Sequence, residues 1–241
     1  VANGFGASGA PGPSDNFAGV PAPEVGAIVK RIGTTWRDAD NTNRNGSVPF
    51  TLPDNDVFSF NATSLAKGTV FSSVGTNLFN MAINPVSGKI YVTNTDSPNE
   101  VMFEGDGDHG GSTVQGKLSL SRVTVLDPTG PSQDIQHLNQ HIQYGDLHTD
   151  PGANHTAINA QVPHSLATPL LPAIHSSGSP VYLPAFGSSK IGVFTRTELE
   201  DANFETNFNP ALASSQYLST TGGGPSGVAI DEVNDRIFVT T

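Results

Sequence analysis

The sequence contains two copies of one fifteen-residue phrase, at 80–94 (NMAINPVSGKIYVTN) and at 227–241 (GVAIDEVNDRIFVTT). The copies align without a gap and are identical at six positions. In each copy two short apolar runs flank a polar turn, which is typical of a β-hairpin. A hairpin that recurs along a chain indicates a solenoid, a propeller or another array of similar units. The second copy reaches the last residue of the sequence, so we expect this chain to be part of something longer.

A third segment fits the same strand of the repeated unit. Ile-Tyr-Val at 90–92, Val-Tyr-Leu at 181–183 and Ile-Phe-Val at 237–239 follow one another at spacings of 91 and 56 residues. A four-stranded blade of a propeller takes about 40–45 residues. The first spacing therefore equals either one blade plus an insertion or two irregular blades. We place a histidine-rich insertion at about 129–162, where the sequence is polar and poor in pattern.

These features predict an all-β chain that forms part of a β-propeller, with four-stranded antiparallel blades and long loops. A blade that is apolar on both faces cannot bury them alone, and blades packed around an axis bury both. We expect residues 1–24 to be an extended Gly/Pro/Ala-rich segment, and residues 25–241 to form about three to four blades. Because so few blades cannot close a ring, the remainder of the same polypeptide or another subunit is expected to complete the propeller.

Composition narrows the classes of function. The net charge of −11 disfavours nucleic acid, whose phosphates are bound by clustered Lys and Arg. The sequence contains no run of about 18 apolar residues, so it predicts no membrane-spanning helix. The absence of cysteine excludes disulfides, iron–sulfur clusters and covalent c-type haem within this chain. The Gly/Ala/Pro/Ser-rich start is typical of a mature secreted protein, so a periplasmic or extracellular location is expected.

Several phrases resemble the YVTN family of β-propellers. They are IYVTN at 90–94 behind NPVSGK at 84–89, SSKIGVF at 188–194 and GGPSG at 223–227. The chain is also similar to exported bacterial proteins in which such a propeller precedes a cytochrome-c-like region with CxxCH motifs. This resemblance implies a c-type cytochrome as a partner, although no CxxCH occurs here.

Two acidic segments are candidate calcium sites. Asp106 and Asp108 alternate with glycine in EGDGDHGG, and Asp38, Asp40 and Asn43 place oxygen side chains at alternate positions of a polar loop. Oxygen ligands on a tight turn suit a hard cation. The second loop resembles the first half of a calcium loop but lacks its terminal Glu. Structural Ca²⁺ is therefore predicted for these segments, and ordinary turn residues are the alternative reading.

His137 and His141 are candidate ligands of a transition metal. Their i, i+4 spacing would place both on one face if the segment were helical, and His148, His155 or an Asp could supply a third ligand. The alternative is that these histidines lie in a solvated loop.

The preferred functional prediction is a non-catalytic propeller scaffold or interaction module of a larger exported bacterial protein. The same prediction includes an association of this module with a redox partner. The alternative is a metal-dependent propeller enzyme of the lactonase or dehydrogenase type, with its site at the central channel. A third hypothesis is a surface adhesin or layer protein stabilised by calcium. No GxSxG elbow or other convergent catalytic set marks a nucleophile in the sequence.

Overall fold

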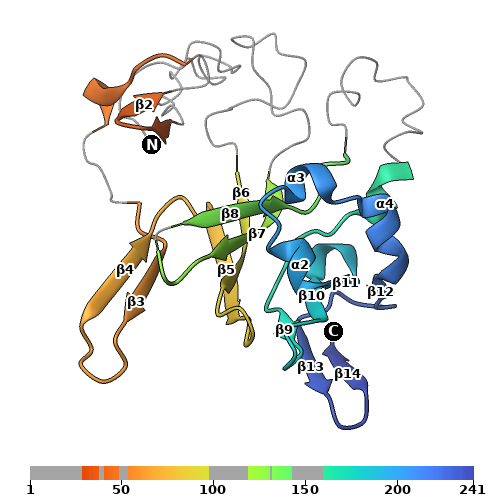
Figure 1. Cartoon of the computed structure of the whole chain (residues 1–241). Coiled ribbons are helices and arrows are strands. Elements are labelled where there is room, and N and C mark those ends of the chain that lie inside the picture. The colour runs from red at the N-terminus through yellow and green to blue at the C-terminus, as the bar shows by residue number, and fades with distance from the viewer. Residues whose placement is uncertain (1–28, 38–40, 49–53, 98–118, 131, 143–159) are drawn as a thin grey trace, which may run out of the picture. The chain divides into compact units, whose positions relative to one another are not determined.

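The computed structural model describes residues 29–37, 41–48, 54–97, 119–130, 132–142 and 160–241 (Figure 1). The chain divides into two compact units, which are described separately. One unit comprises Val1–Pro53, Ser97–Leu118 and Tyr144–His155, and the other comprises Asp54–Asp96, Ser119–Gln143 and Thr156–Thr241. No helix within the described ranges is long and apolar enough to cross a membrane.

The described part of the first unit is a small antiparallel hairpin. Strands β1 (Lys30–Ile32) and β2 (Thr35–Arg37) pair with each other, and the 3₁₀ helix η1 (Asn45–Ser47) follows. The Asn45 side chain accepts a hydrogen bond from the Trp36 backbone N–H at 2.7 Å. This bond fastens the polar loop to the strand.

The second unit contains a four-stranded antiparallel sheet whose strands follow chain order. It consists of β5 (Asn77–Ile83), β6 (Ile90–Asp96), β7 (Leu120–Leu126) and β8 (Gln133–His137). The turn between β5 and β6 forms because the Asn84 side chain accepts the backbone N–H groups of Val86 and Ser87. The hairpin expected from the first copy of the repeated phrase is thus confirmed.

A second four-stranded sheet and two further hairpins complete this unit. The sheet has the order β12-β11-β10-β9, again antiparallel between neighbours. The strands are β9 (Ala173–Ile174), β10 (Val181–Ala185), β11 (Lys190–Phe194) and β12 (Leu218–Ser219), and the hairpins are β3 (Val57–Phe60) with β4 (Lys67–Phe71) and β13 (Gly227–Asp231) with β14 (Arg236–Thr240). The short helices of this unit are η3 (Val162–His164), η4 (Phe186–Ser188), α2 (Arg196–Leu199), α3 (Phe204–Asn207), α4 (Pro210–Ala213) and η5 (Ser214–Gln216).

The three segments aligned in the sequence occupy the same strand of successive sheets. Ile90 starts β6, Val181 starts β10 and Ile237 lies in β14, and each of these is the second strand of its sheet. Among the described residues, the step from β6 to β10 covers one four-stranded sheet with long connections. The first spacing thus corresponds to one four-stranded sheet plus connecting chain. The described chain is mostly antiparallel β-sheet, as expected.

The central strands β6 and β7 of the first sheet are buried on both faces, whereas β5 is largely exposed. Val92 and Leu126 pack on one face with Val57 and Phe71 of the β3–β4 hairpin. On the opposite face, β6 and β7 contribute to a larger cluster shared with the second sheet; its members are Tyr91, Val123, Val125, Leu138, Leu166, Val181, Leu183, Ala185, Phe194, Leu199 and Phe204. In Figure 1 the sheet stands between the β3–β4 hairpin and the second sheet. Alternation of apolar side chains along β6 and β7 therefore supplies two interfaces.

The hairpin turns of successive sheets are bonded to one another. Asn84 donates from Nδ2 to the Gly178 carbonyl in the β9–β10 turn at 3.0 Å. In that same turn Ser176 donates from its backbone N–H, at 2.7 Å, and from its hydroxyl to the Glu232 carboxylate of the β13–β14 turn. The turns of the β5–β6, β9–β10 and β13–β14 hairpins thus lie next to one another, as expected for an array of similar hairpins.

One local prediction differs from the structure. Residues 133–137, within the expected insertion, form β8, the fourth strand of a sheet. Residues 165–171 are irregular apart from a bridge between Pro169 and Ala185.

Candidate functional site

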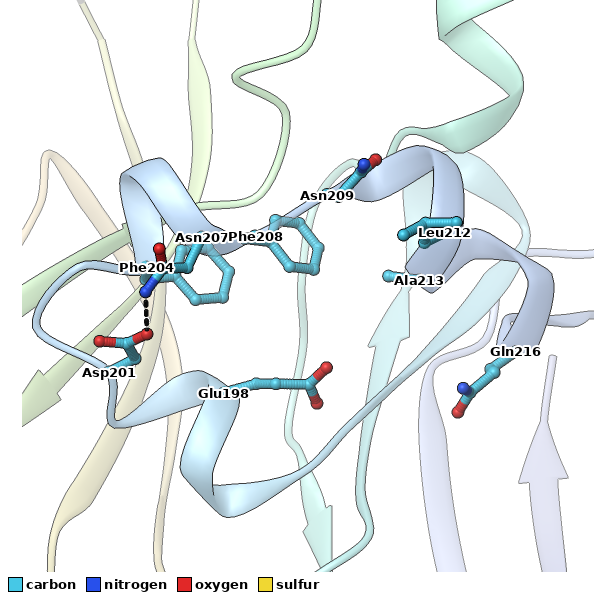
Figure 2. A pocket seen from close by; sticks show the side chains of 9 residues that line it. All are labelled: Glu198, Asp201, Phe204, Asn207, Phe208, Asn209, Leu212, Ala213 and Gln216. Carbon is cyan, nitrogen blue, oxygen red and sulfur yellow. Dashed lines mark hydrogen bonds between the residues drawn. The ribbon is translucent and has the colours of Figure 1, made fainter.

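The connection between β11 and β12 folds into short helices around a hollow of about 230 Å³ (Figure 2). Its lining consists of two carboxylates, three amides and four apolar side chains: Glu198, Asp201, Asn207, Asn209, Gln216, Phe204, Phe208, Leu212 and Ala213. These residues come from α2, α3, α4, η5 and the segments that join them. The hollow brings carboxylate, amide and aromatic groups together on one concave surface and is the candidate site.

Local capping signals explain why this connection is helical. The Thr195 hydroxyl accepts the Glu198 backbone N–H, while the Glu198 carboxylate accepts the Thr195 backbone N–H, which is a capping box. The Asn209 side chain caps α4, where Pro210 occupies the first turn. These caps fix the positions of Glu198 and Asn209 on the rim.

An aromatic cluster lies beneath the hollow. The rings of Phe204 and Phe208 stack with centroids 4.4 Å apart, and Phe208 approaches Phe194 of β11 at 5.6 Å. Phe194 also contacts the ring of Tyr217 at 6.2 Å. Because Phe194 and Phe204 are buried in the core shared by the two sheets, the hollow rests on a rigid base.

The hollow carries negative charge. Hydrogen bonds from Asn207 and from the Asn203 backbone lower the pKa of Asp201, which is therefore ionised at neutral pH. Burial and the nearby charge of Glu198 raise the pKa of Tyr217, whose hydroxyl has no hydrogen-bond partner in the described part of the chain. No Lys, Arg or His is present in the lining.

The candidate calcium ligands are mostly outside the described residues. Asp38, Asp40, Asp106 and Asp108 all fall in those gaps. Asn43 is exposed, and its side chain accepts the Asn45 backbone N–H at 2.9 Å. This is a turn interaction of the kind Asn makes without a metal. The calcium sites stay predictions.

His137 and His141 do not share a helical face. His137 ends strand β8, and His141 lies in the turn that follows. His141 instead faces His164, at 6.4 Å between ring centroids. Its Nε2 lies 3.1 Å from the Gln161 carbonyl, and its Nδ1 is buried without a partner among the described residues. The expectation of a shared helix is corrected, because the chain adopts a strand there.

The His141 environment favours the neutral imidazole. Burial lowers its pKa, the bond to Gln161 opposes this effect, and nearby His164 adds to it. His164 Nδ1 in turn lies 2.6 Å from the Ser214 hydroxyl. In the described ranges, no group of three or more His, Asp or Glu side chains is arranged to hold a metal ion. The transition-metal site therefore stays a prediction.

Sequence reasoning missed both the hollow and the contact between His164 and Ser214. The pairs Thr195 with Glu198 and Asn209 with Pro210 are helix-start signals that could have indicated the helical connection. Nothing local in the sequence signals that Phe204 and Phe208 stack, because neither belongs to a periodic pattern. The contact between His164 and Ser214 spans 50 residues and depends on the tertiary fold.

No protein-family model matches the chain, and no curated protein matches it. Among solved structures, hydrazine synthase of Kuenenia stuttgartiensis is similar at a TM-score of 0.45 and 14% identity. The alignment covers 75% of this chain and 50% of that chain, so this chain spans half the length of its neighbour. At this TM-score the likeness carries no argument about function.

Proposed function

We propose that this chain is a non-catalytic β-propeller scaffold, an interaction module of a larger exported bacterial protein. The observation that carries the proposal is the burial of strands β6 and β7 on both faces, between the β3–β4 hairpin and the second sheet. Sheets that bury each other in series are the architecture of propellers and solenoids. The hydrogen bonds between the turns of the three successive hairpins support the same arrangement.

A comparison of the two copies of the repeated phrase supports one surface as the binding face of the module. Tyr91 of β6 is fully buried against the second sheet, whereas Phe238, its equivalent in β14, is 59% exposed. In the first copy of the phrase, the face that carries Tyr91 is packed against the second four-stranded sheet. We therefore assign to the Phe238 face a further repeat unit as its occupant, located in the same polypeptide. A separate subunit is the alternative that the experiment below detects.

A photo-crosslinking amino acid at position 238 of the native protein tests this assignment. The expected product joins position 238 to a strand outside residues 1–241 of the same polypeptide, as peptide mass spectrometry would show. The matched control is position 233, at the tip of the same hairpin, where Val233 is 93% exposed and no crosslink is expected. A crosslink to another polypeptide would replace the same-chain assignment, and equal labelling at both positions would contradict the docking face.

The association with a c-type cytochrome rests on the resemblance to exported bacterial propeller proteins, and export rests on that resemblance and on the Gly/Ala/Pro/Ser-rich start of the sequence. A CxxCH motif in the encoded sequence beyond residue 241 would support the redox link. Elemental analysis separates the scaffold from the alternative of a metal-dependent enzyme, because a stoichiometric transition metal in the native protein would favour that alternative.

A further inference from the structure

We propose that the hollow beside α2 binds an alkyl cation, meaning an ammonium or guanidinium group on an aliphatic stem. This inference deepens the proposed function, because it names the chemistry of a group that the module binds. It rests on three features of the same surface, which are its unbalanced charge, the unpartnered Oε1 of Glu198 and its aromatic and aliphatic lining.

The charge of the hollow calls for a cationic ligand. Glu198 and Asp201 contribute two carboxylates, and the lining contains no basic side chain to balance them. The other polar groups of the lining are the neutral amides of Asn207, Asn209 and Gln216. An anion would meet repulsion here, whereas a cation gains from both carboxylates.

The hydrogen bonds already made in the hollow decide which cation fits. Both oxygens of Asp201 accept bonds, from the Asn203 backbone and the Asn207 side chain. Glu198 Oε2 accepts two bonds from Thr195, which leaves Oε1 without a partner among the described residues. Calcium needs about six to eight oxygen ligands. The lining has two carboxylates, and no group of three or more His, Asp or Glu in the described residues is arranged to hold a metal ion, whereas Glu198 Oε1 can accept an N–H of an ammonium or guanidinium group.

The apolar part of the lining suits an aliphatic stem. Figure 2 shows the Glu198 carboxylate in the hollow below the Phe208 ring, with Ala213 and Leu212 on the far side. An ammonium near the Phe208 ring gains cation–π attraction, and its methylenes contact Leu212 and Ala213.

The volume of the hollow limits the size of the occupant. Pockets for drug-sized molecules usually measure about 300–1,000 Å³. At about 230 Å³ the hollow is smaller, so it accepts a group the size of one side chain rather than a nucleotide or a haem. A lysine or arginine side chain of a partner and a small free amine share this chemistry.

Titration by NMR of the intact protein tests the proposal. The probes are n-butylammonium, Nα-acetyl-lysine amide and the uncharged alcohol 1-pentanol. We expect both cations to shift the resonances of α2 and α3, and 1-pentanol to bind more weakly. Binding of the lysine derivative indicates that a protein side chain can occupy the hollow, and binding of butylammonium alone would restrict the ligand to free amines.

Three variants sharpen the result. Glu198→Gln keeps the capping box, since Gln serves at that position, and should weaken butylammonium about two- to fivefold. Phe208→Leu keeps apolar volume but removes the ring, and should weaken butylammonium without changing 1-pentanol. Asp235→Asn, on the exposed β13–β14 turn, removes the same charge elsewhere and should change neither.

Two outcomes would overturn the proposal. One is an unchanged butylammonium affinity in Glu198→Gln, and the other is equal binding of 1-pentanol and butylammonium. Tighter binding of Ca²⁺ at the same resonances would also replace it with a metal site. None of these results bears on the crosslink at position 238, so the two proposals fail separately.

Discussion

Tyr91 is the residue at which the first two sheets are joined by polar contacts as well as by packing. Its hydroxyl donates to Glu200 Oε1 at 2.8 Å and accepts from Asn84 Nδ2 at 3.0 Å, inside a fully buried environment. Burial and the bond to Glu200 raise its pKa, so the phenol stays protonated. The equivalent Phe238 lacks the hydroxyl, which shows that this strand position accepts either ring.

We predict that Tyr91→Phe lowers the free energy of unfolding by about 1–3 kcal/mol, because Glu200 and Asn84 lose a buried partner while the ring is retained. Urea unfolding followed by fluorescence or circular dichroism measures this change. Tyr182→Phe is the matched control, at the same strand position of the second sheet, where the described contacts include no hydrogen bond to the hydroxyl. An equal loss in both variants would contradict the role of the hydroxyl.

Burial of the His141 side chain makes the folding stability of the protein depend on pH. Because burial lowers its pKa in the folded state, the unfolded chain binds the proton more readily. The stability contributed by the neutral His141 side chain is therefore complete above its unfolded-state pKa of about 6.5. This stability is lost as the pH falls through the lower pKa of the folded state. We expect His141→Gln to show a smaller loss of stability than the wild type between pH 8 and pH 5.5, measured by urea unfolding. Parallel pH profiles would show that His141 is not the group responsible.

At the scale of elements, the turns between paired strands control how neighbouring sheets meet. Gly178 has φ +85°, and a Cβ there would lie 3.0 Å from both Asn84 Oδ1 and Val86 Cγ2 of the first sheet. Gly88 has φ +75° in the turn of that sheet, but a Cβ there would meet nothing within 4 Å. The two glycines therefore share backbone strain and differ in their contact with a neighbouring turn.

We predict that Gly88→Ala costs about 1 kcal/mol of unfolding free energy, from the left-handed backbone alone. Gly178→Ala should cost roughly 1 kcal/mol more, since Asn84 and Val86 must also move. Chemical unfolding of both variants measures the difference. If the two losses were the same within error, the turn-to-turn contact would carry no energy.

The sequence predicts those elements that contain short apolar runs beside a polar turn. The strands around Ile90, Val181 and Ile237 were located in this way, and each is the second strand of its sheet. Strand β8 was missed because its sequence, QDIQH, is polar. It is stable in the sheet because Gln136, 1% exposed, donates to the carbonyls of Leu199 and Asp201. Such partners are over 60 residues away and cannot be read from local pattern.

The site was harder to predict than the sheets. Leu166 fills the core from irregular backbone that includes Thr168 at φ 55°. Glu198 has a readable capping role, but its position beside Phe208 depends on how three short helices pack. Capping is a local property, whereas the hollow is created by contacts among segments that have no shared periodicity.

For the second unit as a whole, the main feature is the contrast between covered and uncovered sheet faces. Phe238 is 59% exposed on β14, and the stacked pair Phe58 and Phe60 of β3 is 42% and 61% exposed. Exposed aromatic side chains on sheets favour association with other apolar surfaces.

We therefore predict that the chain of residues 1–241 self-associates as its concentration rises, and that Phe238→Ser reduces this association. Sedimentation velocity over a range of concentrations measures the effect. Val233→Ser provides the control, because Val233 is more exposed but lies at a turn tip rather than on a sheet face. Indistinguishable sedimentation of Phe238→Ser and the wild type would contradict a role for this face.

The bonds from Asn84 to Gly178 and from Ser176 to Glu232 each connect one turn only to the next along the chain. Duplication or loss of an entire unit during evolution would accordingly disturb just the two junctions at its borders. A change in the number of repeated sheets therefore requires few compensating substitutions in a protein with this arrangement. A gene can gain or lose one repeat while the contacts within the remaining sheets stay the same.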